Sequence, residues 1–292
     1  MPERAHIVDD RSTMYPLSVK KKKSAVRLEH VTLAKGSTVR FRRAGNGPVG
    51  VLLIHGWACT SRYWESTLDG LAGSGVTAIA VDLPGSGGSR RFQGEEFTFG
   101  ACADHVMRII EALDIPVNVI VGHSMGGPIA AIVSAARGCE RLVLESYCPM
   151  APHRAARLER LRQLEQDSGE RSWIDDIVRS WFVKPIDPAI LATLLDDVHA
   201  TSTEVLAEGT RSILKGLQDE EAIRHCSRAT WIFGEADSNR SIERVFDLAE
   251  QRGSSLRLMR GIGHVPHLED TEAFVELLVE EVRKVNRSDD NG

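Results

Sequence analysis

The chain has 292 residues, of which 42% are hydrophobic, enough for one large domain or for a core with an inserted segment. This composition allows a sizeable buried core and argues against a disordered chain. The 36 Lys and Arg residues against 41 Asp and Glu residues give a net charge of −5. That balance argues against a general nucleic-acid binder, which needs a basic surface.

The cysteines and the apolar runs indicate the cellular compartment. The five cysteines are odd in number and form no C-x-x-C pair, so neither a disulfide framework nor a structural zinc site is expected. No apolar run approaches the roughly 20 residues of a membrane helix, and the N-terminus lacks the apolar segment of a secretory signal. We therefore expect a cytoplasmic protein without a membrane span.

The first segment of the chain, residues 1–24, has the composition of a flexible arm. It mixes charge, Pro and Ser without apolar periodicity and contains four consecutive lysines, Lys20 to Lys23. Segments of this kind do not bury enough apolar surface to fold by themselves. We expect a solvated arm.

From Val26 onward, apolar runs of strand length alternate with helix-like stretches. This alternation is typical of a mostly parallel sheet with helices on both faces. The clearest strands span residues 49–54, 76–81, 117–121, 141–144, 230–233 and 255–259. The clearest helices accompanying them span residues 98–113, 126–136 and 272–285. The predicted fold class is α/β.

The alternation stops after Leu144. Residues 147–226 contain no convincing strand, and their helical stretches span residues 153–166, 172–182, 189–200 and 200–217. We therefore predict a helical segment, residues 147–226, inserted between two parts of the core, residues 25–146 and 227–288.

The sharpest motif is G-x-S-x-G, formed by Gly122, Ser124 and Gly126. It follows a predicted buried strand and precedes a predicted helix, the context in which this motif presents a nucleophilic serine. Side chains in place of Gly122 and Gly126 would collide with neighbouring backbone in so tight a turn. We expect Ser124 to adopt strained backbone angles and to present its hydroxyl.

A serine nucleophile needs a base, and two histidines follow the last predicted strand. His264 falls on the loop after that strand, at the sheet edge where Ser124 also lies, and His267 falls where the last helix region begins. We favour His264 as the base. His267 remains the alternative, with capping or packing as its expected role.

The base in turn needs a carboxylate that fixes its tautomer. Asp237 comes just after the predicted strand 230–233 and gives the chain order Ser, Asp, His. Glu145, at the end of the strand 141–144, is the main alternative, and Glu235 lies close by in the sequence. We favour Asp237.

Two backbone amides are candidates for binding the negative oxygen of the transition state. The N–H of Met125 follows the nucleophile at the start of a helix, where the dipole is positive. The second donor should come from the loop after the strand 49–54, and the N–H of Trp57 is the best placed there. The Trp57 indole is expected to line the substrate pocket, and His55 to shape the loop.

Together these motifs resemble those of the α/β-hydrolase superfamily. The resemblance runs from about Val26 to Val285 and rests on H-G-W, D-L-P-G-S-G-G-S, G-H-S-M-G-G, G-E-A-D and G-I-G-H. It implies a mostly parallel sheet of about eight strands, a Ser-Asp-His triad at its carboxyl edge, and a helical cap that matches the inserted segment. One departure is Ser86, which stands where histidine is common in that family's loop.

The resemblance is greatest to small carboxylesterases, so we expect Ser124, His264 and Asp237 to cleave an ester-type bond. A lactonase, thioesterase, C–C bond hydrolase or acyltransferase would use the same triad, and a slowly turning over, receptor-like protein remains an alternative. Apolar residues of the stretch 172–182 recur at helical spacing, and Trp181 among them is a candidate for substrate binding. The expected partner is a small, apolar substrate. No cofactor, metal or nucleic acid is expected, and the sequence does not indicate an oligomeric state.

Overall fold

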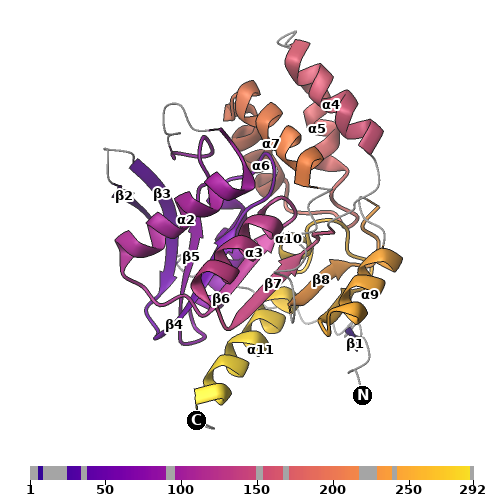
Figure 1. Ribbon diagram of the computed structural model, residues 1–292. Helices are drawn as coiled ribbons and strands as arrows, with labels where there is room; N and C mark the ends of the chain where they lie inside the picture. Colours follow the sequence, from indigo (N-terminus) through magenta and orange to yellow (C-terminus); the bar gives the residue numbers. More distant parts are fainter. Residues whose placement is uncertain are drawn as a thin grey trace.

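The computed structural model describes residues 6–8, 25–33, 38–89, 96–148, 154–166, 171–216, 229–238 and 242–289. A sheet with strand order β1-β9-β8-β7-β6-β4-β5-β3-β2 forms its centre (Figure 1). The strands are β1 (His6–Val8), β2 (Arg27–Thr32), β3 (Thr38–Gly45), β4 (Val49–Ile54), β5 (Val76–Val81), β6 (Val119–His123), β7 (Arg141–Glu145), β8 (Thr230–Gly234) and β9 (Ser255–Met259). All pairs are parallel except β2 with β3 and β3 with β5. The predicted mostly parallel α/β sheet is confirmed.

Strands β2 to β9 are the eight strands of the expected fold, and β1 adds one more at the edge. This short strand pairs with β9 and lies inside the segment that we expected to be an arm. The other residues of that segment, including the lysine run, lie outside the described residues.

Successive side chains of a strand point to opposite faces of the sheet, so each strand packs against helices on both faces. In β4, Leu52 and Ile54 belong to one apolar cluster, whereas Val51 and Leu53 belong to the other. The first cluster includes residues of α2 (Phe99–Leu113), α3 (Gly126–Arg137) and α9 (Ile242–Gln251). The second includes residues of α1 (Glu65–Leu71) and α11 (Thr271–Asp289). Two short helices, the 3-10 helix η2 (Ser61–Trp64) and α10 (Pro266–Glu269), complete the core.

The described residues between β7 and β8, where the sequence predicts a helical insertion, include four helices: α4 (Arg154–Gln166), α5 (Ser172–Arg179), α6 (Pro188–Ala200) and α7 (Thr203–Gly216). Figure 1 shows them grouped at one end of the sheet. Helix α5 ends at Arg179, before the expected boundary at Phe182. The extended backbone of Thr201 ends α6, so α7 starts after the expected residue 200.

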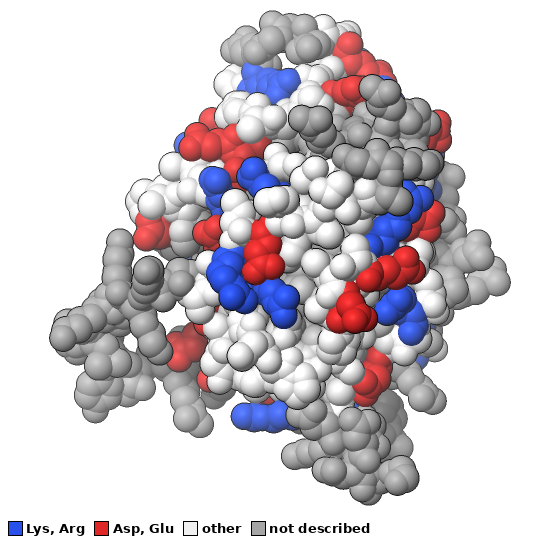
Figure 2. Space-filling view, turned by 90° about the vertical axis from the view of Figure 1, so that its left-hand side faces the viewer, with Lys and Arg blue, Asp and Glu red and all other residues white. Residues whose placement is uncertain are grey.

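No helix in the described ranges is both long enough and apolar enough to cross a membrane. On the face drawn in Figure 2, the described basic and acidic side chains are interspersed and do not gather into an extended patch of one sign.

Candidate active site

The chain turns sharply at Ser124, between β6 and α3. Ser124 has a φ of 50°, in the left-handed region that non-glycine residues rarely adopt. A Cβ on Gly122 would lie 2.4 Å from the Gly126 carbonyl oxygen, and a Cβ on Gly126 would lie 2.5 Å from the Ile54 carbonyl oxygen. The turn therefore requires both glycines, as predicted, and holds the half-buried Ser124 at the carboxyl end of β6.

Ser124, His264 and Asp237 form a continuous chain of hydrogen bonds. His264 Nε2 lies 3.1 Å from Ser124 Oγ, and His264 Nδ1 lies 2.8 Å from Asp237 Oδ2. Both His264 and Asp237 are buried. An Nδ1–H that donates to the Asp237 carboxylate leaves Nε2 free to accept the serine proton. This is the geometry that a serine nucleophile needs.

The loops that carry Asp237 and His264 are joined by their backbones. The N–H of Ala236 donates to the Ile262 carbonyl at 2.9 Å. A Cβ on Gly234 would lie 2.1 Å from the Gly263 carbonyl oxygen, so the close approach of the two loops depends on a glycine at this position. The carboxylate and the imidazole meet although they are separated by 27 residues in sequence.

The two alternatives of the sequence analysis, Glu145 and His267, bind each other. The Glu145 carboxylate oxygens lie 2.8 and 2.9 Å from His267 Nδ1, and one of them accepts the His267 backbone N–H at 3.0 Å. Both side chains are fully buried, and Trp64 stacks on the His267 ring with a centroid distance of 4.1 Å. The hydrogen bonds thus join His264 to Asp237 and His267 to Glu145.

The loop after β4 meets the turn at Ser124. A Cβ on Gly126 would also lie 2.7 Å from the His55 carbonyl oxygen, and a Cβ on Gly56 would lie 2.8 Å from His123 Nδ1. Trp57 directly follows Gly56 and Met125 directly precedes Gly126, so the two candidate oxyanion donors lie beside these close approaches. The Trp57 indole reaches the inserted helices, where Nε1 donates to the Leu206 carbonyl of α7 at 2.9 Å.

Trp181 lies next to the candidate base. Its ring centroid is 6.3 Å from that of His264, and its carbonyl accepts the His264 backbone N–H at 2.8 Å. Sequence reasoning did not single out Glu269, whose carboxylate binds backbone N–H groups close to His264 and Trp181. The Glu269 carboxylate accepts the N–H of Gly263 at 2.7 Å and those of Val183 and Lys184 at 2.9 and 2.8 Å. It thereby joins the His264 loop to the inserted segment.

A family model described as "Alpha/beta hydrolase family" matches residues 51–277, most of the chain. The chain belongs to the alpha/beta hydrolase family. The resemblance stated from the sequence motifs is therefore confirmed.

Relatives and solved structures agree with this membership of the alpha/beta hydrolase family. The chain is 41% identical over 97 residues to the dihydrolipoyllysine-residue acetyltransferase component of an acetoin cleaving system from Cupriavidus necator. That match covers 33% of this chain and 25% of the relative. An esterase from Exiguobacterium antarcticum has a TM-score of 0.75 at 20% identity, covering 87% of this chain and 98% of that chain. An enol-lactonase from Burkholderia xenovorans LB400 has a TM-score of 0.74 at 20% identity, covering 87% and 100%.

In this alpha/beta hydrolase, the loop that contains Ser86 is organised by Asp82. The Asp82 carboxylate accepts the N–H of Ser61 at 2.6 Å and that of Gly88 at 3.1 Å. His55 joins the same region, because its Nε2 accepts the Leu83 N–H at 3.1 Å and its Nδ1 donates to the Gly56 carbonyl at 2.9 Å. Burial lowers the pKa of His55, which agrees with a neutral ring that shapes the loop.

Within the described ranges, no three His, Cys, Asp or Glu side chains are grouped in a way that could hold a metal ion.

The Glu145–His267 pair predicts a pH-dependent contribution to stability. Burial raises the pKa of Glu145 to about 7 from its ordinary value of 4.5. Between these values the unfolded chain loses the Glu145 proton while the folded protein keeps it, so stability falls as pH rises. The free energy of unfolding of wild type, relative to Glu145→Gln, should therefore decrease between pH 4.5 and about 7, as measured by urea unfolding.

Glu111→Gln provides the control, because Glu111 is an exposed carboxyl on α2. Its difference from wild type should stay constant over the same pH range. A difference for Glu145→Gln that is also constant would contradict the effect of burial on the Glu145 pKa.

Proposed function

We propose that this protein is a serine hydrolase that cleaves an ester-type bond of a small, apolar substrate. The observation that carries the proposal is the hydrogen-bonded series from Ser124 Oγ through His264 to Asp237. The family model and the esterase and lactonase structures with the same fold support a hydrolase. Its substrate and its bond type are our inference from the site.

In the proposed reaction, His264 Nε2 takes the proton of Ser124 Oγ as the oxygen attacks the carbonyl carbon. Asp237 holds the Nδ1–H and stabilises the imidazolium. The backbone N–H groups of Trp57 and Met125 donate to the oxyanion of the tetrahedral intermediate. His264 then gives its proton to the leaving alcohol, and water repeats the sequence on the acyl-enzyme and releases the acid.

The test is a panel of acyl esters, lactones and thioesters given to the purified protein. Sustained turnover of at least one class, many cycles per active site, supports the hydrolase. A single burst of product without further turnover would indicate the receptor-like alternative. Faster product formation with an added alcohol, accompanied by a new ester, would indicate acyl transfer.

We also propose that helices α4 to α7 are a cap that determines which substrate enters. Residues of α5, α6 and α7 belong to the same apolar cluster as Trp57 and Met125. A Cβ on Gly209 of α7 would lie 3.1 Å from Trp57 Cδ1 and 3.4 Å from Met125 Sδ. A roof this close to the nucleophile favours a covered pocket and a substrate of moderate size.

Trp181→Ala is the variant that tests the cap. Because Trp181 lies beside His264, the smaller residue should shift the preference among ester chain lengths by about 10-fold or more. Hydrolysis of a small acetyl ester should continue. The measurement is kcat/KM for a series of esters, with Trp173→Ala on α5 as the matched control.

A uniform loss on all esters with a lowered Tm would assign Trp181 to packing, since removal of a buried tryptophan costs about 3–5 kcal/mol. Trp181→Phe keeps most of the side-chain volume, so it tests the effect on ester preference with a smaller loss of stability. Unchanged kinetics over the whole series for both variants would remove Trp181 from the pocket.

A further inference from the structure

Residues 55–60, which we call the oxyanion loop, run from the end of β4 to η2 and carry Trp57. Two side chains of this loop bind the inserted helices. Trp57 Nε1 donates to the Leu206 carbonyl of α7 at 2.9 Å, and Thr60 Oγ1 donates to Asp197 Oδ2 of α6 at 2.7 Å. The inserted segment therefore touches the loop that presents a candidate oxyanion donor.

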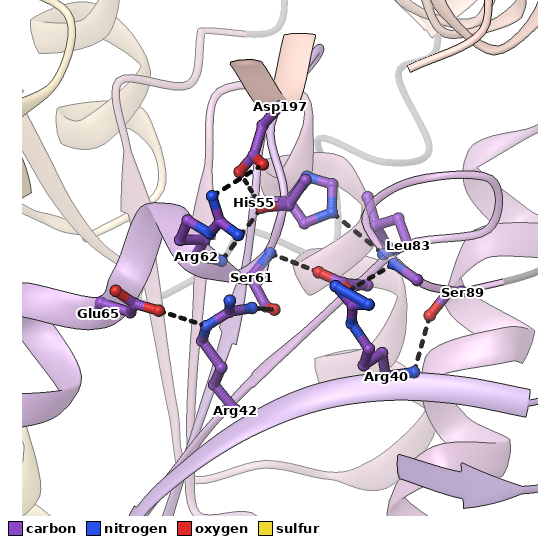
Figure 3. A network of polar contacts seen from close by, with 12 residues as sticks. Arg40, Arg42, His55, Ser61, Arg62, Glu65, Leu83, Ser89 and Asp197 are labelled. Carbon is purple, nitrogen blue, oxygen red and sulfur yellow. Dashed lines mark hydrogen bonds and ion pairs between the residues drawn. The ribbon is translucent and has the colours of Figure 1, made fainter. Parts of the chain in front are cut away.

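Asp197 is the charged part of this contact. Its second oxygen, Oδ1, lies 3.4 Å from the Arg62 guanidinium, and Thr60 Oγ1 accepts the Arg62 backbone N–H at 3.2 Å. Figure 3 shows Asp197 reaching from its helix toward Arg62 and the neighbouring loop. The Asp197 side chain is 16% exposed and Thr60 is buried, so solvent screens their hydrogen bond less than it would a surface pair.

The two ends of the oxyanion loop are fixed by the core. His55 binds the Leu83 N–H, and the N–H of Ser61, just after the loop, donates to Asp82 Oδ1 at 2.6 Å. Between these anchors Ala58 has a φ of 61°, which is disfavoured for a residue with a Cβ. Such a conformation persists only when the surrounding contacts impose it. The hydrogen bonds from this middle part to the inserted helices go to Leu206 and Asp197, and the Arg160 guanidinium of α4 lies 4.7 Å from the Trp57 ring centroid.

From this arrangement we propose that Asp197 is a positioning residue for catalysis. By holding Thr60, its carboxylate keeps the oxyanion loop in the conformation that aims the Trp57 backbone N–H at the developing oxyanion. The inference rests on the proposed function, because it takes Trp57 as an oxyanion donor. It gives the inserted segment a part in the chemistry as well as in substrate selection.

An oxyanion donor acts mainly in the transition state, and this determines which kinetic constant should change. Its hydrogen bond strengthens as charge develops in the transition state, so a misplaced donor lowers kcat more than it changes KM. Removing a whole donor costs about 10²- to 10³-fold in kcat. Asp197 acts through Thr60, so we expect a smaller effect, about 10-fold, for Asp197→Ala.

The experiment measures kcat and KM of Asp197→Ala, Asp197→Asn and the control Asp196→Asn, whose side chain is exposed on the same helix. Asp197→Ala should lower kcat about 10-fold with KM within about twofold of wild type. Asp197→Asn keeps an oxygen that accepts the Thr60 hydroxyl and should recover most of kcat. Thr60→Val should cost less when added to Asp197→Ala than when made in wild type, because both changes break the hydrogen bond between Thr60 and Asp197.

Hydrogen exchange of the same variants gives a readout that does not depend on activity. Asp197→Ala should speed exchange in peptides covering residues 55–64 and leave those covering the His264 loop unchanged. Unchanged exchange at residues 55–64 would overturn the positioning role, whether or not a substrate has been found. A raised KM with wild-type kcat would also overturn it. Absence of turnover in wild type on the whole ester panel would contradict the proposed function instead.

Discussion

Replacing Ser124 with alanine is expected to lower kcat by about 10³-fold or more while the protein stays folded. The Ser124 hydroxyl oxygen is the atom that bonds to the substrate in the proposed reaction, so alanine removes the nucleophile. The side chain is half-buried on a tight turn and contributes little packing. Steady-state kinetics together with circular dichroism measure both parts of the prediction.

The alanine variant should also keep its substrate affinity. A competitive inhibitor should bind Ser124→Ala with a Kd close to that of wild type, because the pocket is unchanged. Near-normal turnover by a folded Ser124→Ala protein would show that another residue is the nucleophile, and the assignment of the triad would be wrong.

The second large effect is expected at the carboxylate. Asp237→Asn should lower kcat by about 10³- to 10⁴-fold, because an amide facing His264 Nδ1 favours the tautomer in which Nε2 carries the proton. Glu145→Gln should be mild, within about 10-fold, because the Glu145 carboxylate binds His267 and not the candidate base. The pair of variants compares two buried carboxylates at the same sheet edge.

The ranking of these two variants is the decisive result. A severe loss of kcat for Glu145→Gln with near-normal kcat for Asp237→Asn would move the catalytic acid to the end of β7. Both Tm values should be recorded, because each change disturbs a buried hydrogen-bonded pair.

The catalytic edge of the fold is predictable from sequence because its constraints are local. Buried parallel strands appear as continuous apolar runs, and the predicted ranges 49–54, 76–81 and 255–259 coincide with β4, β5 and β9. The glycines around Ser124 are required by contacts within the same turn and with the neighbouring strand. Each residue of the triad comes shortly after a parallel strand: Ser124 after β6, Asp237 after β8 and His264 after β9. Parallel pairing brings the carboxyl ends of these strands to one edge of the sheet, so the three residues meet there.

The elements that sequence reasoning missed depend on distant contacts. Strand β3 carries Arg42, a residue that argues against a buried strand. Arg42 is nevertheless buried, because it donates to Glu65 at 2.7 Å and to Ser61 at 2.6 Å. The pairing of Glu145 with His267 joins residues 122 positions apart.

The end of α5 has the same kind of cause. The chain leaves the helix after Arg179, and Trp181 then offers its carbonyl to the His264 N–H. Helical spacing of apolar residues continues past this point in the sequence, so periodicity alone extends the helix too far. Beyond Arg179 the chain contacts the His264 loop and does not continue the helix.

Acylation of Ser124 is the central step of the proposed reaction, and trapping the acyl-enzyme tests it most directly. The protein is mixed with an activated acetyl ester, quenched in acid during turnover, digested and analysed by mass spectrometry. We predict an acetyl group on Ser124 of the wild-type protein that is absent from Ser124→Ala. Two results would contradict the account. One is an acetyl group on a different residue during productive turnover. The other is turnover with no acylated peptide, even under conditions where deacylation limits the rate.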